Sequence, residues 1–135
     1  MVVFACLDDK NGMLFNHRRQ SRDAAVIEDM FGMTEGKLRM NSYSAKLFGA
    51  YTDRIVIEDD PAEYAPECNY FFEDISLKLY EDKIDTIIIY YWNRIYPADT
   101  YMDIDLEQGW RITDVKEFGG KSHEKITRKT YEREI

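Results

Sequence analysis

The sequence has few of the residues that cross-link or interrupt a folded chain. Its 135 residues include two cysteines, three prolines and seven glycines. Cys6 and Cys68 lack the CxxC spacing of redox and metal sites, so we expect free thiols and a reducing, cytoplasmic location. The scarcity of proline and glycine leaves little room for a disordered linker. We therefore expect one domain, residues 1–135, with its own core.

Long apolar runs and an excess of positive charge are also missing. No apolar run approaches the roughly 18 residues of a membrane span, and "MVVFACL" at the start lacks the basic residues of a signal peptide. Lysine and arginine number 18 against 26 aspartates and glutamates, a formal net charge of −8. Duplex nucleic acid is thus an unattractive partner, because its phosphates require a broad positive field. A local positive pocket is still compatible with this charge.

The hydrophobic pattern predicts strands alternating with helices. Strands are expected from apolar or alternating runs at 2–7, 38–41, 54–58, 69–73, 86–92, 109–118 and 125–133. A helix is expected from Ser21, as its N-cap, to about Phe31, and a short one over 43–48. Residues 76–83 fit a helix or a loop. Turn signals lie at 8–12, 32–37 and 59–67.

The last two strands favour an antiparallel hairpin, with a register slip near Asp114 that suggests a β-bulge. Before them, strands are separated by helices or long crossovers, which is typical of parallel pairing. The predicted fold class is therefore α/β, with a central, mostly parallel sheet, few helices and an antiparallel C-terminal hairpin.

Four segments in collinear order resemble the dihydrofolate reductase family. They are "ACLDDKNGM" (5–13), "GKLRMNSYS" (36–44), "ADTYMDIDLEQGWRI" (98–112) and "ITRKTYER" (126–133). The resemblance covers nearly the whole chain and implies the dihydrofolate reductase fold and an NADPH-dependent reductase.

The functional residues of that family do not carry over. Its catalytic carboxylate falls on Val26 when counted without gaps, and on Asp23 only after a gap of three residues. Ser42 and Ser44 stand where the family binds cofactor phosphates with an arginine and a threonine. "EDISLK" (73–78) replaces its Gly-Gly pair. We therefore expect the fold without the standard chemistry, so that NADPH is a possible but not a favoured cofactor.

A second resemblance is to short bacterial proteins that share "FNHRRQS", "WNRxYPADT" and "SHEKIT", some of which carry the label ribonuclease Z. The HxHxDH metal motif of that activity is absent, and two histidines do not make that site. We expect no metal centre.

Three segments are candidate sites. "NHRRQSR" (16–22) brings Arg18, Arg19 and Arg22 to a helix start, which favours an anion; the alternative is a solvated loop paired with surface acids. "WNR" offers Trp92, Asn93 and Arg94 at the end of a strand, or else a core tryptophan and an Arg94–Asp99 pair. "KSHEK" (121–125) offers Ser122, His123 and Lys125, or else a plain polar turn.

Four functions follow as hypotheses. The first is a diverged binding protein or enzyme that holds an anionic small molecule or nucleotide in a cleft with Arg18, Arg19, Arg22 and Arg94. The second is ribonuclease-type cleavage of phosphodiesters, with His17 and His123 as general acid and base and Lys125 stabilising charge. The third is an NADPH-dependent reductase with Asp23 as the acid. The fourth is a structural role, as a monomer or a homodimer.

Overall fold

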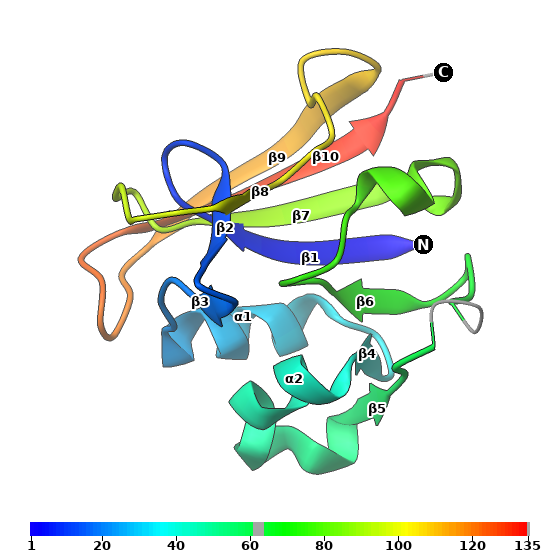
Figure 1. The fold of residues 1–135 in the computed structure, drawn as a ribbon, viewed down its shortest axis with the longest axis horizontal. Helices are drawn as coiled ribbons and strands as arrows, with labels where there is room; N and C mark the ends of the chain where they lie inside the picture. Colours follow the sequence, from blue (N-terminus) through cyan, green and yellow to red (C-terminus); the bar gives the residue numbers. More distant parts are fainter. Residues whose placement is uncertain (61–63, 135) are drawn as a thin grey trace.

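A seven-stranded sheet runs through the computed structural model, which describes residues 1–60 and 64–134 (Figure 1). The strand order is β5–β4–β6–β1–β7–β10–β9. The strands are β1 (Val2–Leu7), β4 (Leu38–Met40), β5 (Ile55–Ile57), β6 (Asn69–Phe71), β7 (Thr86–Tyr91), β9 (Trp110–Phe118) and β10 (Ile126–Arg133). The centre of the predicted turn segment 59–67, residues 61–63, lies outside the described residues.

The pairing confirms the predicted mixture of parallel and antiparallel strands. The first five strands in this order are parallel neighbours, whereas β10 is antiparallel to both β7 and β9. Between β9 and β10 the register moves from Thr130 opposite Asp114 to Tyr131 opposite Ile112. Thr113 is therefore the extra residue of a bulge, at the place where the alternation of the sequence slips.

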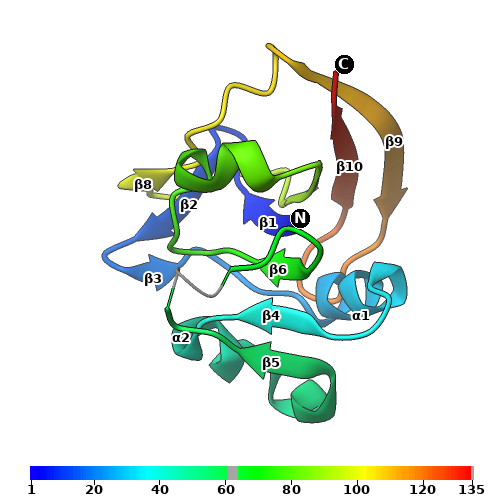
Figure 2. The same cartoon turned by 90° about the vertical axis from the view of Figure 1, so that its right-hand side faces the viewer.

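Successive residues of the central strands point to opposite faces, which explains their continuous apolar runs. In β1, Val3 and Leu7 join a core cluster that includes Leu77 and Met102, whereas Phe4 joins the cluster beneath α1 (Ala24–Met33). Figure 2 shows α1 on one side of the sheet and β8 (Thr100–Tyr101) on the other. The recurring aromatic residues mostly fill these cores; the largest fully buried ones include Tyr70, Tyr90 and Phe72.

Helix α1 begins two residues later than the sequence suggests. Its N-cap is Asp23, not Ser21, because Asp23 has extended backbone and its carboxylate accepts a hydrogen bond from the Ala25 N–H at 2.8 Å. The helix continues through Gly32 to Met33 rather than ending near Phe31.

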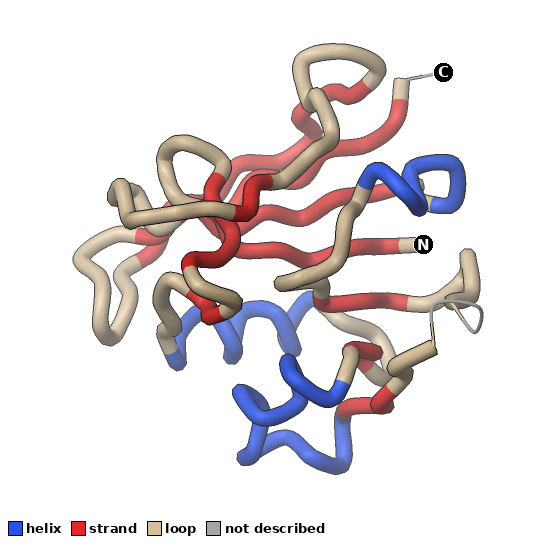
Figure 3. The backbone as a smooth tube through the Cα atoms, viewed as in Figure 1, coloured by secondary structure: helices blue, strands red, loops and turns tan. Residues whose placement is uncertain are grey.

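The other helices are short: α2 (Ser42–Ala45) and the 3₁₀ segments η1 (Lys46–Arg54) and η3 (Lys78–Lys83), seen in Figure 3. The ambiguous segment 76–83 is thus mostly helical. Within the described ranges, none of the helices has the length and apolarity to cross a membrane.

A second sheet of three strands, in the order β3–β2–β8, was not predicted. It consists of β2 (Gly12–Phe15), β3 (Arg18–Arg19) and β8 (Thr100–Tyr101). Asn16 and His17 form the turn between β2 and β3, with φ of 51° and 60°. Positive φ at both turn residues is the geometry of a tight hairpin, and asparagine is among the residues that tolerate it best. The arginine-rich segment therefore forms a hairpin that leads into α1, not a plain loop.

Candidate functional site

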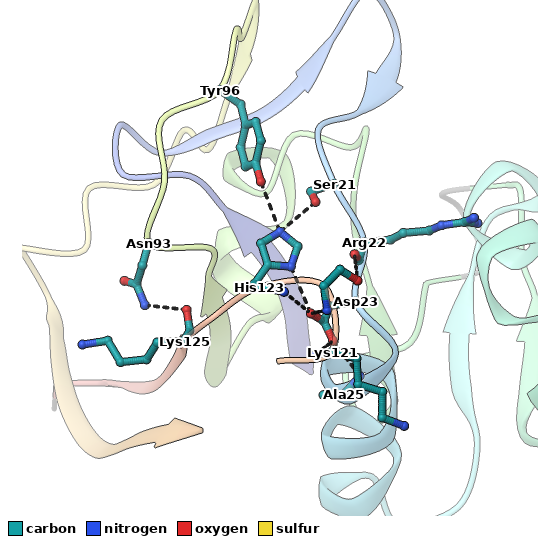
Figure 4. Close-up of polar contacts among 10 residues, drawn as sticks. Ser21, Arg22, Asp23, Ala25, Asn93, Tyr96, Lys121, His123 and Lys125 are labelled. Carbon is teal, nitrogen blue, oxygen red and sulfur yellow. Dashed lines mark hydrogen bonds and ion pairs between the residues drawn. The ribbon is translucent and has the colours of Figure 1, made fainter. Parts of the chain in front are cut away.

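Two segments far apart in the sequence meet beside the end of β7. Because β10 is antiparallel to β7, with Thr127 opposite Tyr91, the loop that precedes β10 lies next to the segment that follows β7. Asn93 links them: its side-chain amide donates to the Lys125 carbonyl at 3.1 Å (Figure 4). The same amide donates to the Thr127 hydroxyl at 3.0 Å. The predicted segments "WNR" and "KSHEK" therefore belong to one site.

The carboxylate of Asp23 anchors the second of these loops to the start of α1. Its Oδ1 accepts from the backbone N–H groups of Ala25 (2.8 Å) and Lys121 (2.9 Å). Its Oδ2 accepts from the N–H groups of Ser122 (2.8 Å) and His123 (3.1 Å) and lies 3.0 Å from the His123 ring (Figure 4). Burial alone would raise the pKa of the Asp23 carboxyl, but these hydrogen bonds outweigh it and lower the pKa to about 2.

Gly120 makes this close approach possible. A Cβ at position 120 would lie 2.5 Å from Oδ2 of Asp23 and 2.6 Å from the carbonyl oxygen of His123. Both distances are far below van der Waals contact, so a side chain at this position would push the loop away from the carboxylate.

The ring of His123 is held by contacts on three sides. Nδ1 faces Asp23, while Nε2 lies 2.9 Å from the Ser21 hydroxyl and 3.1 Å from that of Tyr96. The ring stacks on the Trp92 indole, with centroids 4.6 Å apart and planes at 24°. Since an ionised carboxylate only accepts hydrogen bonds, Nδ1 carries a proton. In the neutral imidazole, Nε2 is therefore an acceptor for the hydroxyls.

An open pocket of about 520 Å³ lies beside His123. Its lining residues are Trp92, Asn93, Arg94, Ser122, His123, Glu124 and Lys125, and we call it the Arg94 pocket. The Arg94 guanidinium lies 5.8 Å from the centroid of the Tyr96 ring and has no ion pair within the described residues. The alternative Arg94–Asp99 pair is not formed, because Asp99 instead accepts hydrogen bonds from Asn16 and Thr100.

The predicted arginine-rich cleft is not assembled as expected. Arg19 forms a bidentate ion pair with Glu73, at 2.8 and 3.0 Å, so its charge is already balanced. Arg18 lines a separate pocket with Phe15 and neighbouring residues. Arg22 lines a third, and Figure 4 shows its side chain directed away from His123. Arg19 lines both the pocket of Arg18 and that of Arg22, so the three hairpin arginines border neighbouring pockets, whereas Arg94 lies in another one.

His17 does not join His123. It lies exposed in the turn between β2 and β3, and it is not among the residues that line the Arg94 pocket. Within residues 1–60 and 64–134, no hydrogen bond or ring contact connects the two histidines. The two-histidine mechanism therefore lacks the shared pocket that it requires.

The positions that correspond to the reductase phosphate sites are occupied by acid–hydroxyl pairs. The backbone N–H and hydroxyl of Ser42 both donate to Asp59, and the Ser44 hydroxyl donates to Glu73 at 2.8 Å. Glu73 and Asp74 begin the segment that replaces the Gly-Gly pair. The hydroxyls are therefore already used, and the neighbouring carboxylates would repel a phosphate.

A small cleft lies between α1 and the sheet, and its lining includes Ser21, Asp23 and Trp92, the residues that contact the His123 ring. It encloses about 20 Å³, roughly the room needed for one water molecule. Its walls include the apolar side chains of Met13, Val26 and Trp92, together with Ser21 and Arg22. A planar bicyclic ligand would not fit without movement of these walls.

The comparisons with known proteins identify the fold. A scan against protein-family models and a search of curated proteins find no match. Among solved structures, a dihydrofolate reductase from Enterococcus faecalis, complexed with NADP(H) and RAB-propyl, aligns with 99% of this chain and 96% of its own, at a TM-score of 0.70 and 10% sequence identity. The fold is that of dihydrofolate reductase. This confirms the family resemblance at the level of the fold.

Three residues of this site are not singled out for their role by the sequence. Ser21 was assigned as a helix cap, although its hydroxyl contacts His123 instead. Tyr96 lies in the quoted segment "WNRxYPADT", but nothing in its local pattern points to a histidine ring. Gly120 is half of a Gly-Gly turn, and only the packing of Asp23 shows why a side chain is not tolerated there.

Proposed function

We propose that the protein binds an anionic small molecule or nucleotide in the Arg94 pocket and does not act as a standard reductase. The single observation that supports this most is the Arg94 guanidinium, which has no ion pair among residues 1–60 and 64–134, in one open pocket with Lys125. Arginine offers planar, paired donors that suit a phosphate or a carboxylate. Lys125 makes only a long surface contact of 3.6 Å with Glu117, so it can turn toward a ligand at little cost.

The composition of the pocket narrows the class of ligand. Ser122 adds a hydroxyl, and the stacked pair Trp92 and His123 is part of the lining. Glu124 is the one acid in the lining, so the pocket holds two cations against one anion in a chain of net charge −8. Such a local reversal of charge concentrates anions at the site. A phosphate that carries a planar group fits these features best.

Asp23 argues against standard reduction. A catalytic carboxyl must expose an oxygen to the substrate, whereas both oxygens of Asp23 accept hydrogen bonds from the protein itself. With its pKa lowered to about 2, the group is also a poor proton donor at neutral pH. The acidic surroundings of Ser42 and Ser44 are equally unsuited to NADPH phosphates.

Titration of the protein with AMP and with inorganic phosphate tests the proposal. We expect AMP to raise the midpoint of thermal unfolding in a saturable way, and Arg94→Ala to weaken its affinity by roughly 10- to 100-fold, the cost of a charge-assisted contact. Arg111→Ala is the matched control, because Arg111 is an exposed arginine of β9 outside the pocket. If Arg94→Ala and Arg111→Ala bind AMP equally well, or if neither anion binds to the wild type, the proposal is wrong.

A further inference from the structure

Ser21, His123 and Asp23 form a line of hydrogen bonds that anion binding does not require. The Ser21 Oγ lies 2.9 Å from Nε2 of His123, and Nδ1 of the same ring lies 3.0 Å from Oδ2 of Asp23. The geometry points to a nucleophilic serine, with Ser21 as the nucleophile, His123 as the general base and Asp23 as the group that orients it. This inference does not depend on an anion in the Arg94 pocket.

The protons are placed as such a mechanism requires. Asp23 is an acceptor, so the ring donates through Nδ1 and keeps the lone pair of Nε2 for the Ser21 hydroxyl. Asp23 would also stabilise the positive ring after proton transfer. The stack on Trp92 fixes the plane of the imidazole, and hydrogen bonds from three backbone N–H groups of its loop hold the carboxylate. The base is therefore oriented from several directions before any substrate arrives.

The Tyr96 hydroxyl lies 3.1 Å from the same Nε2 and is the second hydroxyl at this nitrogen. Ser21 is the one of the two that also lines the cleft beside α1, where a substrate atom could reach it. Ser21 is half-buried, whereas His123 and Asp23 are buried. This is expected when the nucleophile must be reached by a substrate and the base and its partner are shielded from water.

The cleft sets the size of the group that could react. Its volume of about 20 Å³ and its apolar walls of Met13, Val26 and Trp92 suit a methyl-sized group. The substrate class is therefore an ester with a short acyl group, such as an acetate ester.

The reaction balances with water as the second reactant. The Ser21 oxygen attacks the ester carbonyl while its proton passes to Nε2 of His123. The bond to the alcohol then breaks, and the alcohol leaves with that proton, which gives an acetyl-serine. Water attacks this intermediate and its proton passes to the same nitrogen. Acetic acid departs as the proton returns to the serine oxygen.

A fluorophosphonate probe and 4-nitrophenyl acetate together test the inference. We expect mass spectrometry to locate the phosphonyl adduct on Ser21, and Ser21→Ala to abolish it and to slow hydrolysis by roughly 100-fold or more. Ser76→Ala is the control, since its hydroxyl bonds Asp103 away from the site and should leave both signals unchanged. His123→Gln should lower the rate of labelling at Ser21 by a similar factor.

Some outcomes would overturn the inference. These are an adduct on another residue only, no adduct at all, or hydrolysis by Ser21→Ala at the wild-type rate. If His123→Gln fails to fold, as judged by circular dichroism, the location of the adduct and the Ser21→Ala rate still decide the question. Failure here would leave AMP binding to Arg94 untouched, so the two proposals are tested separately.

Discussion

Replacing Asp23 with asparagine should destabilise the protein in a way that depends on pH. The substitution keeps an oxygen for the N–H groups of Ala25 and Lys121 but turns an amide toward Ser122 and His123, which are also donors. The pKa of the carboxyl is lowered from 3.8 to about 2, which corresponds to about 2 kcal/mol of stability at neutral pH. The amide of the asparagine would also face the N–H groups of Ser122 and His123 without an acceptor between them. We therefore expect the unfolding free energy to fall by about 3 kcal/mol in total at pH 7.

The sign of the pH dependence follows from the lowered pKa of Asp23. The charge stabilises the folded state above the unfolded pKa of 3.8, and this contribution disappears as the pH falls toward the folded pKa of about 2. The difference in unfolding free energy between wild type and Asp23→Asn should therefore be about 1 kcal/mol smaller at pH 3 than at pH 7. Other carboxyls also titrate here, but their effects cancel in the difference between the two proteins.

Urea unfolding, followed by tryptophan fluorescence at several pH values, measures this difference. Asp82→Asn serves as the control: Asp82 is exposed, and its carboxylate has no hydrogen bond or ion pair among the described residues, so its loss should change stability by no more than about 0.5 kcal/mol. An equal destabilisation at pH 7 and pH 3 would refute the role of the charge. If Asp23→Asn lowers the unfolding free energy by less than about 1 kcal/mol at pH 7, the hydrogen bonds to Asp23 do not stabilise the protein as inferred.

Two further predictions concern the loop and the cofactor. Gly120→Ala should lower the unfolding free energy by about 2 kcal/mol or more, because its methyl group would collide with Asp23 and His123. A Cβ at Gly119 would make only an ordinary contact, 3.9 Å from the Glu124 carbonyl oxygen, so Gly119→Ala should cost less than about 1 kcal/mol. Equal effects in urea unfolding would contradict this geometry. NADPH should produce no saturable quenching of Trp92 and Trp110 fluorescence up to millimolar concentrations, and saturable quenching would favour the reductase instead.

Much of the fold could be predicted because its signals are local. The apolar runs of β1 and β7 predict strands that are buried on both faces, and the alternation in β9 reveals even its bulge. The sequence does not predict the hairpin between β2 and β3, because its turn residues Asn16 and His17 do not include the glycine that is typical of two-residue hairpin turns. The cap of α1 was misplaced for a similar reason, since serine and aspartate are both good caps and stand two positions apart.

The candidate site was harder to predict, because its contacts connect distant parts of the chain. The segments "WNR" and "KSHEK" each looked polar and reactive, but only the pairing of β7 with β10 shows that they share a pocket. Conversely, Arg19 looked free in the sequence and is held by Glu73, 54 residues away. Clustered arginines indicate charge, whereas the availability of each charge depends on tertiary contacts.

The hydrogen bonds from the loop after β9 to Asp23 span 98 to 100 residues. Contacts of such long range form late, because the entropy of closing a large loop must be overcome before they stabilise the chain. The site should therefore be absent from any intermediate in which β9 and β10 are still detached. Hydrogen exchange at the amides of Lys121 and Ser122 would report the docking of the last two strands, so slow exchange there marks a completely folded molecule.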